Sequence, residues 1–163
     1  MTYRVMTVCT GNICRSPMAE VVLRDRFESA GLGDRVTVES TGVSDEERGN
    51  PIDRRARRTL SAHGYRVPEH RARRVTAAEL AERDLVLAMT SGHARALRRI
   101  AGTDVDVRLY RSFDPSAPTG GPEHLLDVDD PWYGPQEVFE QTLAEIEAAA
   151  DAIVDHVRDA LGS

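Results

Sequence analysis

Two residues near the N-terminus have the types and the spacing needed for phosphoryl transfer. Cys9 and Arg15 are separated by five residues, and Ser16 follows directly, within the run VCTGNICRSP at residues 8–17. A cysteine thiolate is a strong nucleophile, and a guanidinium binds two phosphate oxygens as a fork, which lysine does not. In the alternative interpretation, Cys9 is a buried cysteine at a strand end and Arg15 is an exposed helix residue. That interpretation gives no reason for this spacing. The pattern predicts a phosphocysteine intermediate on Cys9.

The residues between the cysteine and the arginine must form a cradle for the phosphate. A short β-branched segment at residues 3–8 predicts a strand, and helical spacing begins after Pro17 and runs toward Gly31. Backbone N–H groups in such a turn converge on one point, and the helix adds its positive end, so Cys9 is expected to rest as a thiolate. We expect Gly11 to adopt a backbone conformation that a side chain would resist. The predicted phosphate-binding residues are Thr10, Gly11, Asn12, Ile13, Cys14, Arg15 and Ser16.

A phosphate ester with a poor leaving group also needs a carboxylic acid that protonates the departing oxygen. Asp127, Asp129 and Asp130 lie in a segment rich in Pro, Gly and Asp at residues 113–135, which we interpret as a long loop without its own core. Asp130 precedes a proline and is therefore held in an extended conformation. We predict that Asp130 is the acid, that Asp129 helps to bind or position it, and that Asp127 is solvated.

Strands that alternate with helices position these groups. Such alternation predicts a parallel sheet with helices on both faces, an α/β three-layer sandwich in a single domain over residues 1–163, with the phosphate-binding loop after the first strand. The expected later strands cover residues 35–40, 84–88 and 105–109, and the expected later helices follow Asp53, Thr76, Thr90 or Ser91, and Pro135.

The composition restricts the class of protein. The net charge of −6, from 27 acidic and 21 basic residues, argues against a nucleic-acid partner. There is no apolar segment of roughly 20 residues that predicts a membrane span. Two cysteines five positions apart and five scattered histidines predict neither a disulfide framework nor a metal site. We expect a cytoplasmic monomer without a cofactor.

The run VCTGNICRSPMAE at residues 8–20 resembles the signature of the low-molecular-weight protein tyrosine phosphatases. The resemblance continues through residues 40–42 (STG), 70–72 (HRA) and 84–89 (DLVLAM) to residues 129–134 (DDPWYG). It implies a four-stranded parallel sheet, no metal, and Asp130 as the aspartate of the family's Asp-Pro motif. It also implies that Asn12, Ser40 and His70 form a hydrogen-bond network that supports the loop.

The resemblance also indicates a substrate. Trp132 and Tyr133 follow the predicted acid and are expected to form an aromatic wall for a phosphotyrosine ring. Ile13 favours phosphotyrosine, because the similar arginine phosphatases carry threonine at the matching position. Glu46 stands where many tyrosine-specific members have an aromatic residue, so one wall of the pocket is expected to be polar and acidic. Thr90 stands where many members carry aspartate.

Other readings of the same motif stay open. Cys14 is either inert packing or a redox partner that captures a sulfenic form of Cys9, and Ser16 caps the helix, donates to the Cys9 sulfur, or does both. A protein arginine phosphatase, an arsenate reductase and a non-catalytic phosphopeptide-binding module remain alternatives, although no cysteine beyond residue 14 could relay a disulfide. Phosphoproteins and inorganic phosphate are the expected partners.

Overall fold

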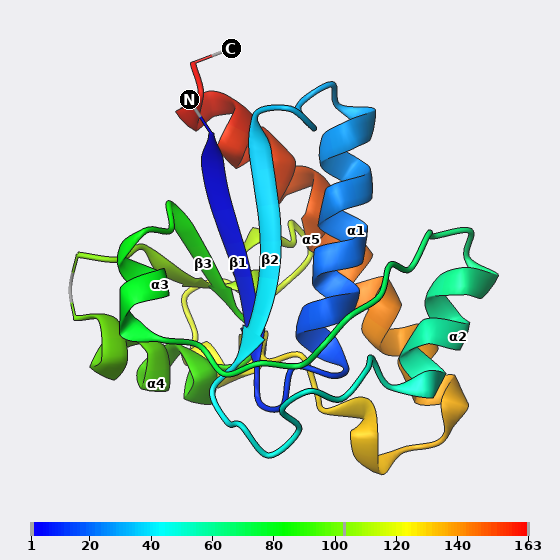
Figure 1. Cartoon of the computed structure of the whole chain (residues 1–163). Helices are drawn as coiled ribbons and strands as arrows, with labels where there is room; N and C mark the ends of the chain where they lie inside the picture. Colours follow the sequence, from blue (N-terminus) through cyan, green and yellow to red (C-terminus); the bar gives the residue numbers. More distant parts are fainter. Residues whose placement is uncertain (1, 103, 163) are drawn as a thin grey trace.

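The computed structural model describes residues 2–102 and 104–162, which include one parallel sheet at the centre (Figure 1). The strand order is β2-β1-β3-β4, and all three neighbouring pairs are parallel. The strands are β1 (Tyr3–Cys9), β2 (Val36–Gly42), β3 (Leu85–Ala88) and β4 (Val107–Leu109). The predicted four-stranded parallel sheet is confirmed, although the fourth strand begins two residues later than expected.

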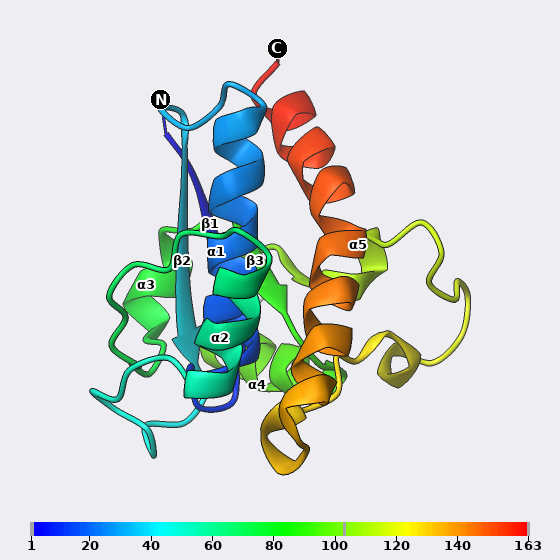
Figure 2. The same ribbon diagram turned by 90° about the vertical axis from the view of Figure 1, so that its right-hand side faces the viewer.

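Helices cover both faces of the sheet (Figures 1 and 2). On one face lie α1 (Arg15–Ser29), α2 (Arg54–Ala62) and α5 (Gln136–Ala160), and on the other lie α3 (Ala77–Ala81) and α4 (Ser91–Ala101). The core follows the alternation of the strands: Val5 and Leu87 pack with the first group, whereas Met6 and Ala88 pack with the second. No helix in the described part of the chain is both long enough and apolar enough to cross a bilayer.

Local capping signals in the sequence begin the helices as predicted. The Asp53 side chain accepts a hydrogen bond from the Arg55 amide at the start of α2. Thr76 and Glu79 form a reciprocal capping box at α3. Of the two candidate caps for α4, Thr90 is the one that accepts from a first-turn amide. These caps matter for the site because α2 and α4 both begin at the carboxyl edge of the sheet.

The long segment before α5, predicted as a loop, contains short regular turns. It contains two short 3-10 helices, at Glu123–Leu126 and Pro131–Tyr133, and follows a third at Tyr110–Phe113. Val128 is fully buried within this segment, and its amide donates to the Met89 carbonyl at 2.8 Å. One apolar residue thus anchors the segment at the end of β3, a short distance before Asp130.

Candidate active site

The loop after β1 has its carbonyl groups turned outward. Four of its carbonyl oxygens, those of Cys9, Thr10, Asn12 and Ile13, accept hydrogen bonds of 2.7–3.1 Å from the amides of Val43, Ser44 and Asp53 and from the His70 ring. In a planar trans peptide the carbonyl and the following N–H point in opposite directions. These bonds therefore turn the N–H groups of four loop residues toward the loop interior, where the first turn of α1 adds its own N–H groups.

Cys9 lies at the base of this loop with 2% of its surface exposed. Its Sγ atom is 3.0 Å from the Oγ atom of Ser16. Ser16 also accepts a hydrogen bond from Asn12 Nδ2 at 2.9 Å and lies 3.1 Å from the carbonyl oxygen of Thr41. The single Ser16 hydroxyl hydrogen can thus serve either the sulfur or that carbonyl. The structure brings Cys9 and Ser16 together as the sequence predicted.

Backbone conformation in the loop corrects the prediction for Gly11. Asn12, with φ of 61°, has a left-handed conformation, whereas Gly11 does not. A Cβ atom on Gly11 would instead lie 3.0 Å from Cγ of Glu47, so a side chain there would have to displace the Glu47 side chain. Gly42 at the end of β2 is more constrained still, because a Cβ there would collide with the backbone carbonyl of Thr10.

Asn12 is fully buried, and hydrogen bonds engage both polar atoms of its side chain and its backbone carbonyl. Its Nδ2 donates to Ser40 Oγ at 3.0 Å as well as to Ser16, and its Oδ1 accepts from the Arg73 amide at 3.0 Å. His70 Nε2 donates to the Asn12 carbonyl at 2.7 Å. The predicted grouping of Asn12, Ser40 and His70 is present in the structure, and it stabilises an asparagine in a conformation that most residues avoid.

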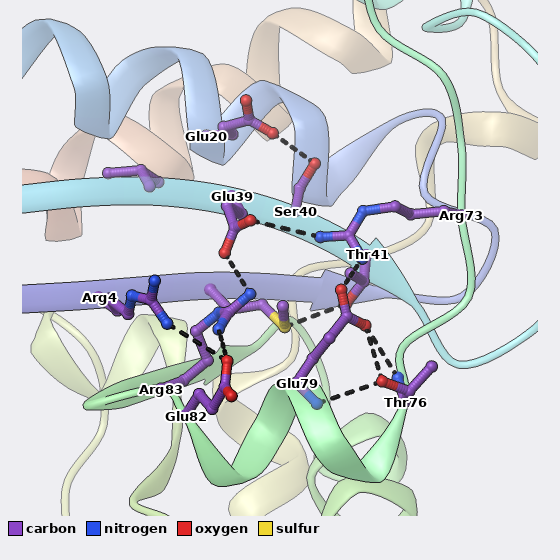
Figure 3. Close-up of polar contacts among 12 residues, drawn as sticks. Arg4, Glu20, Glu39, Ser40, Thr41, Arg73, Thr76, Glu79, Glu82 and Arg83 are labelled. Atoms are coloured by element: carbon purple, nitrogen blue, oxygen red, sulfur yellow. Dashed lines mark hydrogen bonds and ion pairs between the residues drawn. The ribbon is translucent and has the colours of Figure 1, made fainter.

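A network of charged side chains holds the segment that carries Arg73 (Figure 3). The Arg73 guanidinium lies between Glu39 on β2, at 3.6 Å, and Glu79 on α3. Glu39 also pairs with Arg83 at 2.6 Å. Ser40 donates to Glu20 on α1 at 2.6 Å. Of this network, sequence reasoning identified only Ser40 as a site residue; it missed the charged residues Glu39, Arg73 and Arg83, because charged residues far apart in the chain give no pairing signal.

Arg15 crosses the mouth of the loop with 4% of its surface exposed. One terminal nitrogen donates to the Val128 carbonyl at 2.9 Å, and the other lies 3.4 Å from Thr10 Oγ1 and 3.5 Å from Asp130 Oδ2. Its Nε atom is buried and has no hydrogen-bond partner among the described residues. A buried donor of this kind is normally satisfied by a ligand, by water or by an ion.

Of the three loop carboxylates, Asp130 alone reaches Arg15 in the described structure. Its backbone is extended, with φ of −76° and ψ of 110°, and its Oδ1 accepts from the Trp132 amide at 3.1 Å. Asp129 is exposed. The prediction that Asp127 is merely solvated is wrong, because its Oδ1 accepts from the Ser91 amide at 2.7 Å and so fixes the start of α4.

These groups surround a pocket of about 230 Å³. Its lining residues are Cys9, Thr10, Gly11, Ile13, Cys14, Arg15, Glu46, Glu47, Asp130, Trp132 and Tyr133. The four residues predicted for the substrate pocket are therefore all present. Trp132 and Tyr133 pack edge to face with ring centroids 5.1 Å apart, and they are 48% and 83% exposed. They form one aromatic side of the pocket, and Glu46 and Glu47 form an acidic side.

The family model for low molecular weight phosphotyrosine protein phosphatase matches residues 4–161. The chain belongs to this family. It is 47% identical to the low molecular weight protein-tyrosine-phosphatase of Streptomyces coelicolor over 98% of this chain and 96% of the relative. It is 45% identical to the low molecular weight protein-tyrosine phosphatase A of Mycobacterium tuberculosis, over 96% and 93%. The low molecular weight phosphotyrosine phosphatase structure from Vibrio cholerae superposes with a TM-score of 0.84 at 30% identity, covering 96% and 97%.

One residue that holds the segment around Asp130 in this phosphatase was missed in the sequence. Arg55, in the first turn of α2, donates to the carbonyls of Gly134 at 2.7 Å and Trp132 at 3.2 Å, and it pairs with Asp53 at 3.0 Å. The Asp53 amide in turn donates to the Ile13 carbonyl in the loop after β1. The start of α2 therefore fixes the position of the loop that carries Cys9 relative to the loop that carries Asp130.

Sequence reasoning also missed His93. It lies in the first turn of α4, is 6% exposed, and places Nε2 2.8 Å from Thr10 Oγ1. Burial, together with the nearby Arg15 charge, lowers the pKa of His93 to about 3, so the ring is neutral at ordinary pH. The signal available in the sequence was Thr90: as the cap of α4, it puts the first turn of that helix at the carboxyl edge of the sheet, beside the end of β1.

Cys14, the predicted redox partner, is a buried free thiol that lines the same pocket as Cys9. Burial is the main reason that its pKa is raised, and the carboxylate of Asp53 acts in the same direction. Cys14 is thus a neutral thiol at ordinary pH. In the described part of the phosphatase, no group of three or more His, Cys, Asp or Glu side chains is arranged to hold a metal ion.

A larger hollow of about 450 Å³ lies along the exposed edge of β2, away from Cys9. Arg4, Arg24 and Arg83 line it, and Figure 3 shows two of them beside their acidic partners. The three arginines pair with Glu82 at 3.4 Å, Glu20 at 2.7 Å and Glu39 at 2.6 Å respectively. Because each arginine is already matched by a carboxylate, this hollow lacks the net positive charge of an anion site, and the pocket at Cys9 remains the candidate active site.

Proposed function

We propose that this enzyme hydrolyses phosphotyrosine in proteins through a phosphocysteine intermediate on Cys9. The observation that carries the proposal is the position of the Cys9 sulfur, at the base of a loop whose amides face inward, beneath Arg15 and beside Asp130. A tetrahedral dianion fits the inward amides and the guanidinium, which together neutralise its equatorial oxygens.

In the first step, the Cys9 thiolate attacks phosphorus in line with the ester oxygen. The sulfur–phosphorus bond forms as the phosphorus–oxygen bond breaks, and Asp130 gives its proton to the departing phenolate, which leaves as tyrosine. Arg15 donates hydrogen bonds to the phosphoryl oxygens in the transition state, and its donors include Nε, which has no partner among the described residues. The 3.5 Å contact between Arg15 and Asp130 places the proposed acid next to the group that binds the phosphoryl oxygens.

In the second step, water hydrolyses the phosphocysteine. Asp130, now ionised, removes a proton from the attacking water, the new phosphorus–oxygen bond forms, and the sulfur leaves as a thiolate with release of inorganic phosphate. Ser16, 3.0 Å from the sulfur, donates its hydroxyl hydrogen to the departing anion. This role uses the hydrogen that Ser16 otherwise shares with the Thr41 carbonyl.

The pocket walls support an aromatic substrate. Trp132 and Tyr133 offer exposed ring faces and edges beside the acid, and Ile13 contributes an apolar surface. A phosphoarginine substrate is disfavoured by Ile13, since arginine phosphatases carry threonine there. When an external peroxide has oxidised Cys9 to a sulfenic acid, Cys14 is the proposed partner whose thiol condenses with it to give a disulfide and water, because both cysteines line the same pocket.

Hydrolysis of matched phosphotyrosine, phosphoserine and phosphoarginine peptides by the purified enzyme tests the substrate class, with phosphotyrosine expected to be the best. Cys9→Ser should abolish turnover while phosphate binding persists, and a rapid chemical quench of the wild type should recover phosphorus bound to sulfur. Asp130→Ala should slow aryl phosphates with poor leaving groups by about 10²–10⁴, whereas the control Asp34→Ala, at an exposed aspartate outside the pocket, should have little effect. An active Cys9→Ser variant, or equal losses in the two aspartate variants, would contradict the proposal.

A further inference from the structure

Two nitrogen atoms lie within hydrogen-bond distance of the side-chain oxygen of Thr10, the residue that follows the nucleophile. His93 Nε2 is 2.8 Å from Thr10 Oγ1, and a terminal nitrogen of Arg15 is 3.4 Å from the same oxygen. Thr10 also lines the pocket at Cys9. The direction of each hydrogen bond at this oxygen determines where the hydroxyl hydrogen points.

The Arg15 contact has only one possible direction. A guanidinium has donors and no acceptor, so the Thr10 oxygen accepts from Arg15. At the His93 contact, either Thr10 donates to a bare Nε2 or a protonated Nε2 donates to Thr10. A neutral imidazole carries one hydrogen, so the two arrangements differ in which His93 nitrogen bears it.

The other ring nitrogen favours one arrangement. Nδ1 of His93 is buried and has no hydrogen-bond partner among the described residues. A hydrogen on Nδ1 would be a buried donor without an acceptor, which is costly and rare in folded proteins, whereas a bare lone pair there is better tolerated. Because burial and the Arg15 charge lower the pKa of His93, the ring does not carry both hydrogens at ordinary pH.

We propose that His93 Nε2–H donates to Thr10 Oγ1 and thereby frees the Thr10 hydroxyl hydrogen to donate to an oxygen of the bound phosphoryl group. Thr10 then occupies both of its lone pairs with Arg15 and His93 and keeps one donor for the ligand. Thr10 is a phosphate-binding residue through its side chain as well as its amide, and His93 is its positioning residue. The inference rests on the proposed function of the same pocket.

The position of the imidazole is set by elements on both sides of it. Thr90 Oγ1 accepts from the His93 amide at 3.1 Å, and Asp127 accepts from the Ser91 amide at 2.7 Å. The first turn of α4 is therefore fixed both by the end of β3 and by the segment that leads to Asp130. This rigidity allows a ring nitrogen to orient a hydroxyl without a flexible intermediary.

Nitrogen NMR on the whole labelled protein tests the proton assignment without any turnover. The His93 signals, identified by their loss in His93→Gln, should show a protonated Nε2 and an unprotonated Nδ1 between pH 6 and 8. A hydrogen on Nδ1 would overturn the inference, because Thr10 would then spend its own hydrogen on the ring.

Binding of inorganic phosphate, measured by calorimetry, tests the role of the hydroxyl. Thr10→Val should raise the dissociation constant by about tenfold or more, as expected for a lost hydrogen bond to a charged group, while Thr10→Ser should stay within about threefold of the wild type. His93→Leu should weaken binding in the same direction, and His93→Gln, whose amide can still donate, should restore most of it.

The double variant Thr10→Val/His93→Leu separates positioning from general packing. It should bind phosphate no more weakly than Thr10→Val alone, since His93 acts through the hydroxyl. Additive losses, or a His93→Leu variant with unchanged phosphate affinity, would contradict the inference. If these results hold but phosphotyrosine is not hydrolysed, the proposed function fails while the hydroxyl assignment stands.

Discussion

Replacing Asn12 with alanine should lower the free energy of unfolding of the enzyme by more than most substitutions of a single polar residue do. The change removes two hydrogen bonds donated by Nδ2, to Ser16 and Ser40, and one accepted by Oδ1 from the Arg73 amide. At about 0.5–1.5 kcal/mol for each bond, the loss is about 1.5–4.5 kcal/mol. Alanine at a φ of 61° adds about 1 kcal/mol, because it lacks the local hydrogen bonds that let asparagine adopt the left-handed region. We expect a total loss of about 2.5–5.5 kcal/mol.

Urea unfolding followed by circular dichroism measures this loss, with phosphate affinity measured on the same samples. Asn50→Ala is the matched control: Asn50 is exposed and its side chain donates to Glu47, so it should cost less than about 0.5 kcal/mol. Phosphate affinity should fall in Asn12→Ala even where most molecules are folded, since the loop amides lose their orientation. A loss of stability below about 1 kcal/mol with normal phosphate affinity would refute the reasoning.

Four further changes follow from the geometry. Gly42→Ala should lower stability by about 1–3 kcal/mol and weaken phosphate binding, because the new methyl group meets a loop carbonyl rather than a flexible side chain; unfolding and calorimetry measure both, and neither should change if the strand end can simply shift. Arg55→Ala should reduce kcat/KM for poor aryl leaving groups by about 10-fold to 100-fold through a displaced acid loop, and a matched loss for good leaving groups would argue against that cause. In a Cys9→Ser background, Cys14 should react with iodoacetamide at pH 8 at least about tenfold more slowly than a free thiol, because its raised pKa keeps it protonated; rapid labelling followed by mass spectrometry would contradict this. His93 binds a proton in the unfolded chain near pH 6.5 but in the folded chain only near pH 3, so its contribution to stability is lost as pH falls below about 6.5, at up to about 1.4 kcal/mol per pH unit; the stability advantage of the wild type over His93→Gln should shrink between pH 6.5 and 4, and a constant difference would refute it.

Much of the fold was predictable because its signals are local. The apolar alternation of β1 and the caps at Asp53, Thr76 and Thr90 depend on residues within a few positions of one another. Strand ends were less certain, since pairing partners decide them: β2 continues to Gly42, opposite Cys9, beyond its predicted end at residue 40.

The residues of the site were predictable where a sequence motif identified them. They were uncertain where their roles depend on contacts with residues far apart in the chain. Gly11 was expected to adopt the backbone conformation that a side chain would resist. Asn12 has the left-handed conformation instead, since its hydrogen bonds offset the strain. Asp127 was expected to be solvated, but it caps α4 from a segment 36 residues later in the chain. Neither outcome could be derived from residue type, because each depends on a partner distant in sequence.

By itself, the sequence determined which chemistry is available: a cysteine and an arginine at the spacing of a phosphate loop, an aspartate held extended by a proline, and a regular alternation of strands and helices. Only the tertiary structure decided which groups support them. Arg55, Arg73 and His93 act through contacts across 61 to 83 residues of chain, and hydrogen bonds depend on distance and direction in space, which the order of residues along a chain does not specify.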